Sequence, residues 1–246
     1  MTVAPTTVGR ASPTCPTCNA LAAALAQITD DPVVVHTAGR TDTGVHALEQ
    51  VVHFDTPAVR PLSAWVRGAN ALLPRDIAVL WAHAVPDEFH ARFSAQARSY
   101  QYVLVNRPSR VGVHHGKVGW FHLPLDVAAM QAAAKLLLGE HDFSAFRAAE
   151  CQAKSPVKHL TRLGIRQQGD TIFFDLTANA FLHHMVRNIV GCLVYVGKGK
   201  QPPQWMREVL EGRDRSRAAP TFAPHGLYLK RIHYDASWRL PQLHFE

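Results

Sequence analysis

The amino-acid sequence predicts an α+β fold of two similar halves, each with a mainly antiparallel sheet and helices packed on one face. A helical pattern followed by strand-like runs occurs twice along the 246 residues. The strand-like runs lie close enough to pair as hairpins rather than through parallel crossovers. Hydrophobic residues make up 47% of the chain, which is enough to fill one large or two small cores. We expect the active cleft to lie between the halves.

The first half is predicted to span residues 17–107 and to follow an irregular leader over residues 1–16. The leader is rich in threonine, proline and small residues and shows no apolar periodicity. Beyond it, apolar residues recur at helical or at alternating spacing. We expect helices over residues 19–28 and 62–73, and strands over residues 32–37, 50–54, 77–85 and 98–105.

The second half is predicted to span residues 108–246. Its longest helical pattern contains Met185, Ile189 and Leu193, which are four residues apart and form one apolar stripe. We expect helices over residues 125–138 and 181–196, and strands over residues 160–166, 171–177 and 226–234.

The charge of the chain favours an anionic partner. Lysine and arginine outnumber aspartate and glutamate by 26 to 19, which gives a formal net charge of +7. Many basic proteins bind no nucleic acid, so the charge alone leaves that function open. No window approaches the roughly 18 apolar residues that span a bilayer. Without a signal-peptide pattern, we expect a cytoplasmic protein whose four cysteines are reduced.

Asp42 is the leading catalytic candidate. It lies in a polar turn between two strand-like runs, and Gly39 and Gly44 flank it. Glycine permits positive φ and a close approach of backbone to a ligand. A carboxylate on a connection that is held at both ends is exposed yet well positioned, which is typical of functional residues.

Tyr100 and Tyr102 alternate with polar residues, so both rings point to one face of a strand. Either ring could stack on a nucleic-acid base, a contact of about 1–3 kcal/mol. Two aromatic residues on one strand face are also the ordinary composition of a core, and the pattern by itself favours that interpretation.

Arg187 lies off the apolar stripe of its predicted helix. Its planar guanidinium suits a carboxylate or a phosphate. The alternative is an ordinary solvated arginine, which the pattern by itself favours.

Metal and cofactor motifs are weak. Cys15 and Cys18 have the spacing of a zinc half-site or a redox pair, but the sequence has no second CxxC. The adjacent His183 and His184 would not share a face of a helix. The sequence has no glycine-rich phosphate loop, GxSxG or HExxH motif. These motifs therefore give no support for nucleotide hydrolysis, serine acyl transfer or zinc peptidase chemistry, and we expect no metal ligation or redox role.

Several motifs in order resemble the TruA family of tRNA pseudouridine synthases. They are residues 38–47 (AGRTDTGVHA), residues 89–95 (FHARFSA), Tyr100 and residues 181–191 (FLHHMVRNIVG). The resemblance runs collinearly from about residue 19 to about residue 234.

The resemblance implies a pseudouridine-synthase-like fold and a homodimer that isomerises uridine at positions 38, 39 and 40 of the tRNA anticodon stem-loop without a cofactor. By motif position, Asp42 matches the catalytic nucleophile and Tyr100 the tyrosine stacked against the base. Arg187 matches the arginine paired with the aspartate, and Arg40 matches an arginine implicated in base flipping.

The chain departs from the family at its start. The Tyr-Asp-Gly strand and the Gly-Trp-Gln segment with which the family opens are absent from the sequence. Loss of a central strand would leave the backbone groups of its two neighbours unpaired. The alternative function is therefore a catalytically impaired RNA-binding remnant. A third possibility is a zinc or redox protein that uses Cys15 and Cys18.

Overall fold

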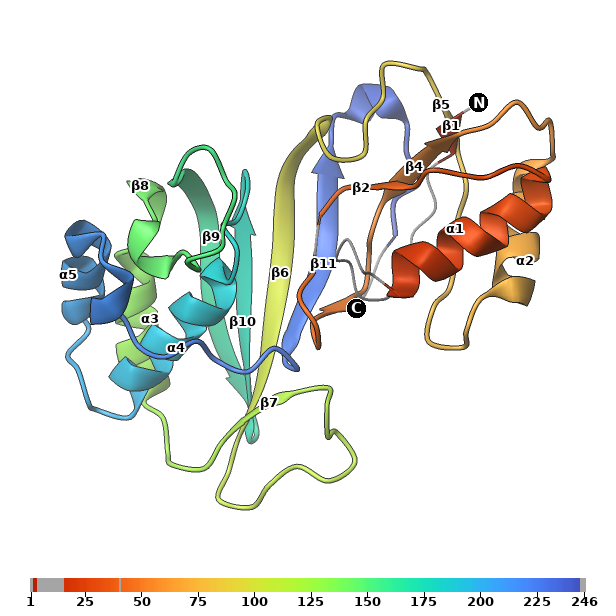
Figure 1. Ribbon diagram of the computed structural model, residues 1–246. Helices are drawn as coiled ribbons and strands as arrows, with labels where there is room; N and C mark the ends of the chain where they lie inside the picture. Colours follow the sequence, from red (N-terminus) through yellow and green to blue (C-terminus); the bar gives the residue numbers. More distant parts are fainter. Residues whose placement is uncertain (1, 4–15, 40, 244–246) are drawn as a thin grey trace. The chain divides into compact units, whose positions relative to one another are not determined.

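The computed structural model describes residues 2–3, 16–39 and 41–243 (Figure 1). The chain forms two compact units. Unit 1 comprises Met1–Gln96 and Leu229–Glu246, and unit 2 comprises Ala97–Tyr228. This division differs from the predicted boundary at residue 107. The reason is that β6 (Ala95–Asn106) and β11 (Leu227–Tyr234) are continuous strands, each with residues in both units.

Unit 1 contains a four-stranded sheet in the order β2-β4-β1-β5. Its strands are β1 (Thr2–Val3), β2 (His36–Thr37), β4 (Val52–Asp55) and β5 (Ala84–Val85). β1 pairs antiparallel with both β4 and β5. The predicted irregular leader is therefore wrong at Thr2 and Val3, because their backbone forms an inner strand. Residues 1 and 4–15 of that leader lie outside the described residues.

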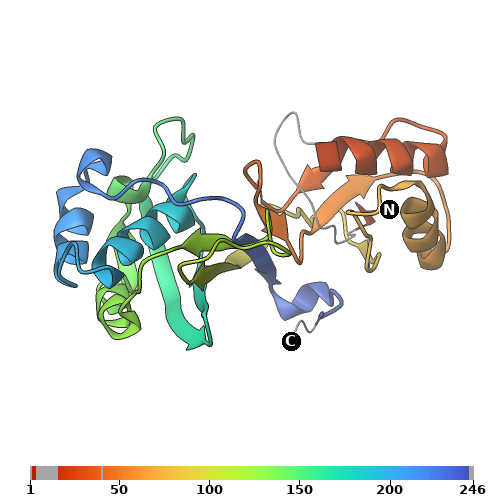
Figure 2. The same ribbon diagram turned by 90° about the horizontal axis from the view of Figure 1, so that it is seen from below.

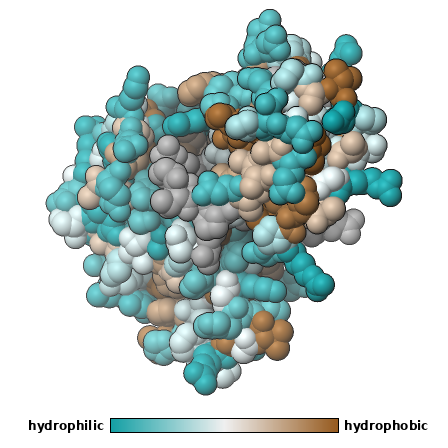
Figure 3. All heavy atoms as spheres, turned by 45° about the vertical axis from the view of Figure 1, so that its right-hand side comes forward, coloured by the Kyte–Doolittle hydropathy of each residue, from teal (hydrophilic) through white to brown (hydrophobic). Residues whose placement is uncertain are grey.

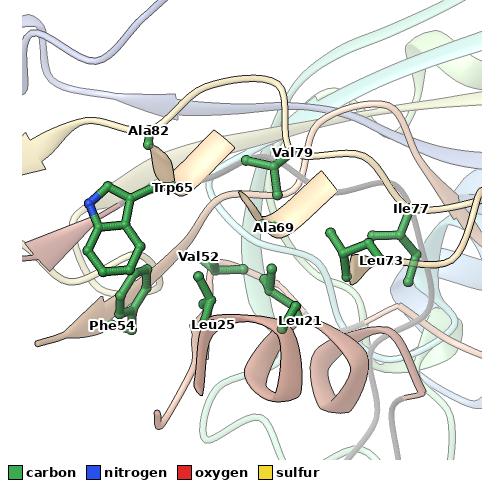
Figure 4. Close-up of a cluster of buried hydrophobic side chains, with 11 residues drawn as sticks. Leu21, Leu25, Val52, Phe54, Trp65, Ala69, Leu73, Ile77, Val79 and Ala82 are labelled. Atoms are coloured by element: carbon green, nitrogen blue, oxygen red, sulfur yellow. The ribbon is translucent and has the colours of Figure 1, made fainter. Parts of the chain in front are cut away.

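Two helices, α1 (Pro16–Thr29) and α2 (Leu62–Leu72), pack with the sheet of unit 1 (Figure 2). The four-residue spacing of Leu21 and Leu25 puts both side chains into the core, where each is 1% exposed. Figure 4 shows them in one cluster with Phe54 and Trp65, whose rings meet edge to face at 5.5 Å. Burial of each such side chain contributes about 1.5–3 kcal/mol.

The predicted strand over residues 77–85 is shorter in the structure. Only Ala84 and Val85 form β5. The side-chain amide of Asn70 donates to the carbonyl oxygen of Val79 at 2.8 Å, and its oxygen accepts from the Val79 N–H at 2.7 Å. Because Asn70 satisfies both backbone groups of Val79, this segment does not require a neighbouring strand there.

Unit 2 contains the strands β6, β10, β9 and β8, which are neighbours in that order, and β7 pairs with β6. Their bounds are β7 (Gly119–Phe121), β8 (Gly139–Asp142), β9 (Val157–Gln168) and β10 (Thr171–Ala178). Only the pairing of β7 with β6 is parallel among these. The predicted strands over residues 98–105, 160–166 and 171–177 are confirmed.

The helices of unit 2 are α3 (Val127–Lys135), α4 (Met185–Gly197) and α5 (Trp205–Gly212). Asp126 caps α3 by accepting from the Ala129 N–H. α4 begins four residues later than predicted, because His184 has a left-handed backbone with φ 62°. The described chain also has three short 3₁₀ turns, η1 (Ser144–Phe146), η2 (Arg215–Arg217) and η3 (Ala236–Trp238). The predicted α+β class with mainly antiparallel sheets is confirmed.

Hydrophilic side chains cover most of the face that Figure 3 presents, with smaller groups of hydrophobic side chains among them. Within the described part of the chain, no helix has both the length and the apolar character needed to cross a membrane.

Candidate active site

Asp42 lies in unit 1, in a turn that ends where β3 (His46–Ala47) begins. Its carbonyl oxygen accepts from the Val45 N–H at 3.0 Å, and Gly44 has φ 87°, a conformation that favours glycine. The Gln50 side chain donates to the Gly39 carbonyl oxygen at 2.7 Å and accepts from the Gly39 N–H at 3.3 Å. These bonds fix the N-terminal side of the turn. Arg40 lies outside the described residues.

The chain beyond the turn is held by β11. The Leu48 N–H donates to the Leu229 carbonyl oxygen at 2.8 Å. The buried Glu49 carboxylate accepts from the Ile232 N–H at 3.0 Å, and burial raises the pKa of this carboxyl. Asp42 therefore sits on a connection that is anchored at both ends, as predicted, but the residue is half-buried rather than exposed. Glu49 was not predicted as a site residue. Its position among apolar residues is the sequence signal that could have identified it.

Tyr100 and Tyr102 lie in unit 2 on β6 and differ in their surroundings. The Tyr102 ring is fully buried, and its hydroxyl donates to the Ala223 carbonyl oxygen at 2.8 Å. Burial raises the pKa of this phenol. Tyr102 is therefore a core residue, as the ordinary interpretation predicted. Tyr100 is only half-buried, and its ring meets Phe181 edge to face at 5.0 Å.

Arg187 lies on the first turn of α4 in unit 2, where its guanidinium is held in place. Its Nε donates to the Phe222 carbonyl oxygen at 2.9 Å, and the Phe222 N–H donates back to the Arg187 carbonyl oxygen at 3.2 Å. Its positive charge opposes the rise in the pKa of Tyr102. The solvated interpretation of Arg187 is therefore wrong, because the side chain is half-buried and bonded to a distant segment of the chain.

A buried polar network fixes the segment that carries Phe222. The Asn188 side chain donates to the Phe146 carbonyl oxygen at 2.7 Å. Its oxygen accepts from Arg215 at 3.0 Å and from the Thr221 hydroxyl at 2.7 Å, and Arg215 also donates to Thr221. The sequence signal for this network was an asparagine in an apolar helix.

His183 and His184 precede α4 instead of lying within it. Their rings are 4.0 Å apart, so the prediction that a helix would separate the two side chains is wrong. The His183 N–H donates to the Cys151 sulfur at 3.3 Å. Cys18 is half-buried in α1, and Cys15 lies outside the described residues.

Unit 1 holds a histidine cluster that the sequence analysis did not identify. The rings of His36 and His53 stack at 4.8 Å, and His90 meets His53 at 4.5 Å. The Nδ1 atom of His53 accepts from the Ala91 N–H at 3.1 Å, so its other nitrogen carries the proton of the neutral ring. Burial, with the neighbouring histidines, lowers the pKa of His53 to about 4.

Comparison with known proteins adds family evidence to this geometry. A family model described as tRNA pseudouridine synthase matches residues 7–94 and 133–235. The tRNA pseudouridine synthase A of Nitrosomonas europaea is 60% identical over 221 residues, which cover 90% of this chain and 81% of the relative. That of Dechloromonas aromatica is 59% identical over 223 residues, with coverages of 91% and 85%.

A chain in the crystal structure of a Cbf5-Nop10-Gar1 complex matches with a TM-score of 0.36 and 12% identity. The match covers 78% of this chain and 45% of that chain.

Proposed function

Because the chain belongs to the tRNA pseudouridine synthase family, we propose that it isomerises uridine to pseudouridine at positions 38, 39 and 40 of the tRNA anticodon stem-loop. Its family makes it an isomerase. The observation that carries the proposal is the anchored turn with Asp42, which lies inside the matched residues 7–94. The three positions follow from the resemblance of the motifs.

The reaction calls for a nucleophile, and Asp42 supplies one. The bond between uracil N1 and ribose C1′ breaks, and a bond between uracil C5 and C1′ forms. A proton leaves C5 and one is gained at N1, so no oxidant, reductant or metal enters the balance. An aspartate carboxylate can attack the nucleoside while the base turns.

The remaining site residues are proposed to bind the substrate. A base inside a stem must leave the stack, which costs a few kcal/mol. Stacking on the half-buried ring of Tyr100 offsets about 1–3 kcal/mol of that cost. The bonds between Arg187 and Phe222 pre-organise the guanidinium for contact with an anionic group. Arg40 is proposed to assist base flipping, from its motif position.

The test is tritium release from tRNA that carries 5-³H-uridine. Wild type and the matched control Asp76→Asn, an exposed aspartate of unit 1, should release tritium. Asp42→Asn should release none, although it should unfold at the wild-type temperature. Transcripts with a single uridine at position 38, 39 or 40 test the positions. A folded wild type that releases nothing from any tRNA would overturn the proposal.

The pairing of β1 argues against the alternative function, a catalytically impaired RNA-binding remnant. That alternative depended on an unfilled place in the sheet, yet β1 pairs with both β4 and β5 at that place. We further propose that the enzyme acts in the cytoplasm as a homodimer, as the resemblance implies. Sedimentation equilibrium with and without tRNA measures the oligomeric state.

A further inference from the structure

Unit 2 has a cluster of lysine and aromatic side chains where α4 ends. The ammonium nitrogens of Lys198 and Lys200 lie 4.2 and 4.4 Å from the centroid of the Tyr195 ring. Trp205, at the start of α5, stacks with Tyr195 at 6.2 Å and an interplanar angle of 20°. Lys198 also lies 5.9 Å from the ring of Phe121. We call these five residues the basic-aromatic surface.

The backbone brings the two lysines to one ring. The Lys200 N–H donates to the Tyr195 carbonyl oxygen at 3.0 Å, and the Gly199 N–H donates to the Val196 carbonyl oxygen at 2.9 Å. This is the Schellman pattern of a helix end, which needs a left-handed residue; Gly199 supplies it with φ 73°. The local sequence therefore dictates the arrangement before any ligand binds.

Stability of the helix does not require both lysines. One cation at the C-terminus of α4 already interacts favourably with the helix dipole and with the Tyr195 ring. A second ammonium group at the same ring adds repulsion between like charges. None of the ion pairs found among the described residues supplies a carboxylate to either lysine. An anion bound between the two would remove the repulsion.

The segment around Phe121 is also basic. Residues 107–125 contain no aspartate or glutamate. They contribute Arg107, Arg110 and Lys117, of which Arg107 pairs with Asp170 at 3.0 Å. Trp120 is 38% exposed, and its Nε1 donates to the Arg107 carbonyl oxygen at 2.9 Å. Exposed aromatic rings among basic residues are typical of RNA-binding surfaces.

We propose that the basic-aromatic surface binds backbone phosphates of the tRNA substrate, away from the reacting nucleotide. This rests on the proposed function. Lys198, the residue after α4, follows Arg187 by eleven positions, which is about 17 Å along the helix axis. The lysines therefore contact other nucleotides than Arg187 does. They supply compact point charges that suit phosphate.

The test compares Lys198→Gln/Lys200→Gln with the control Lys135→Gln/Lys154→Gln, which removes two exposed lysines of unit 2. Dissociation constants for unmodified tRNA are measured by fluorescence anisotropy across a KCl series. Loss of two phosphate contacts to a duplex should reduce the slope of log K against log salt by about 1.8. Near 0.15 M salt, that change weakens binding about 30-fold. Lys198→Arg/Lys200→Arg should restore most of it.

The outcomes separate this proposal from the proposed function. Wild-type protein that releases no tritium from tRNA would contradict the proposed function. Wild-type activity together with a control-like affinity and salt slope in Lys198→Gln/Lys200→Gln would overturn the surface alone. A changed sedimentation coefficient with unchanged RNA affinity would also overturn it, because the surface would then contact protein. Thermal unfolding of each variant confirms that it is folded.

Discussion

The segment that carries Phe222 packs closely against α4 at Gly191, and a substitution there tests whether this close approach is required. A methyl group at Gly191 would lie 2.3 Å from the carbonyl oxygen of Pro220. The substitution Gly191→Ala must therefore push this backbone away by roughly 1 Å to reach an ordinary contact distance. The two hydrogen bonds between Phe222 and Arg187, at 2.9 and 3.2 Å, would then exceed bonding distance.

The free energy of unfolding should fall by about 3 kcal/mol. Overpacking of a helix interface costs about 1–3 kcal/mol. Loss of a hydrogen bond from a charged group costs about 1.5–3 kcal/mol. Replacement of glycine by alanine inside a helix returns up to about 1 kcal/mol. For a chain of this length, the melting temperature should fall by about 6–12 °C.

The matched control is Gly68→Ala in α2. Its methyl group would meet the end of the Ile28 side chain at 3.1 Å, which can rotate away. This variant should match wild type or exceed it by up to about 1 kcal/mol. Urea denaturation and tritium release are measured for both variants, and kcat/KM should fall only in Gly191→Ala. An unchanged urea midpoint in Gly191→Ala would refute the packing argument.

Three further outcomes follow from the contacts of single residues. Tyr102→Phe removes the buried bond to the Ala223 carbonyl oxygen and should cost about 1–3 kcal/mol in urea denaturation, whereas Tyr100→Phe at the half-buried ring should cost much less. Tyr100→Phe in single-turnover assays also tests whether its hydroxyl helps to remove the C5 proton; a full rate would eliminate that role. Since burial lowers the pKa of His53 to about 4 from 6.5, the unfolded chain takes up the proton first, and stability should fall as the pH drops from about 6.5 to 4. The loss should be about 1–2 kcal/mol after allowance for solvent screening, and His53→Asn should reduce it.

Helices and strands with a strong apolar periodicity were predictable, because each of them buries one face and leaves the other face more exposed. The alternation in β10 and the helical spacing in α2 specify which face is buried. The two-residue strand β1 carries too little pattern to detect. Its pairing depends on β4 and β5, which are more than 45 residues away along the chain.

The site could be predicted only in part. Motifs and residue types identified Asp42, Tyr100 and Arg187 as candidates, and their roles stay predictions. The partner that holds Arg187 was not, because the Phe222 carbonyl belongs to the backbone and lies 35 residues further along the chain. Every residue has a backbone carbonyl, so the residue type does not indicate which carbonyl accepts the hydrogen bond. The histidine cluster was missed for a related reason, since its members come from three separate segments.

The two ends of α4 should act independently in this enzyme. The N-terminal end positions Arg187 through Phe222, and the C-terminal end presents Lys198 and Lys200. Gly191 and Lys198 are about 10 Å apart along the helix, and no residue of the described contacts is shared between these two groups. Energies of such separate sites usually add within about 0.5 kcal/mol. Combining Gly191→Ala with Lys198→Gln/Lys200→Gln should therefore change kcat/KM by the product of the separate factors. If the change in kcat/KM of the combined variant differs from that product by more than this amount, phosphate binding at one end of α4 moves the arginine at the other end.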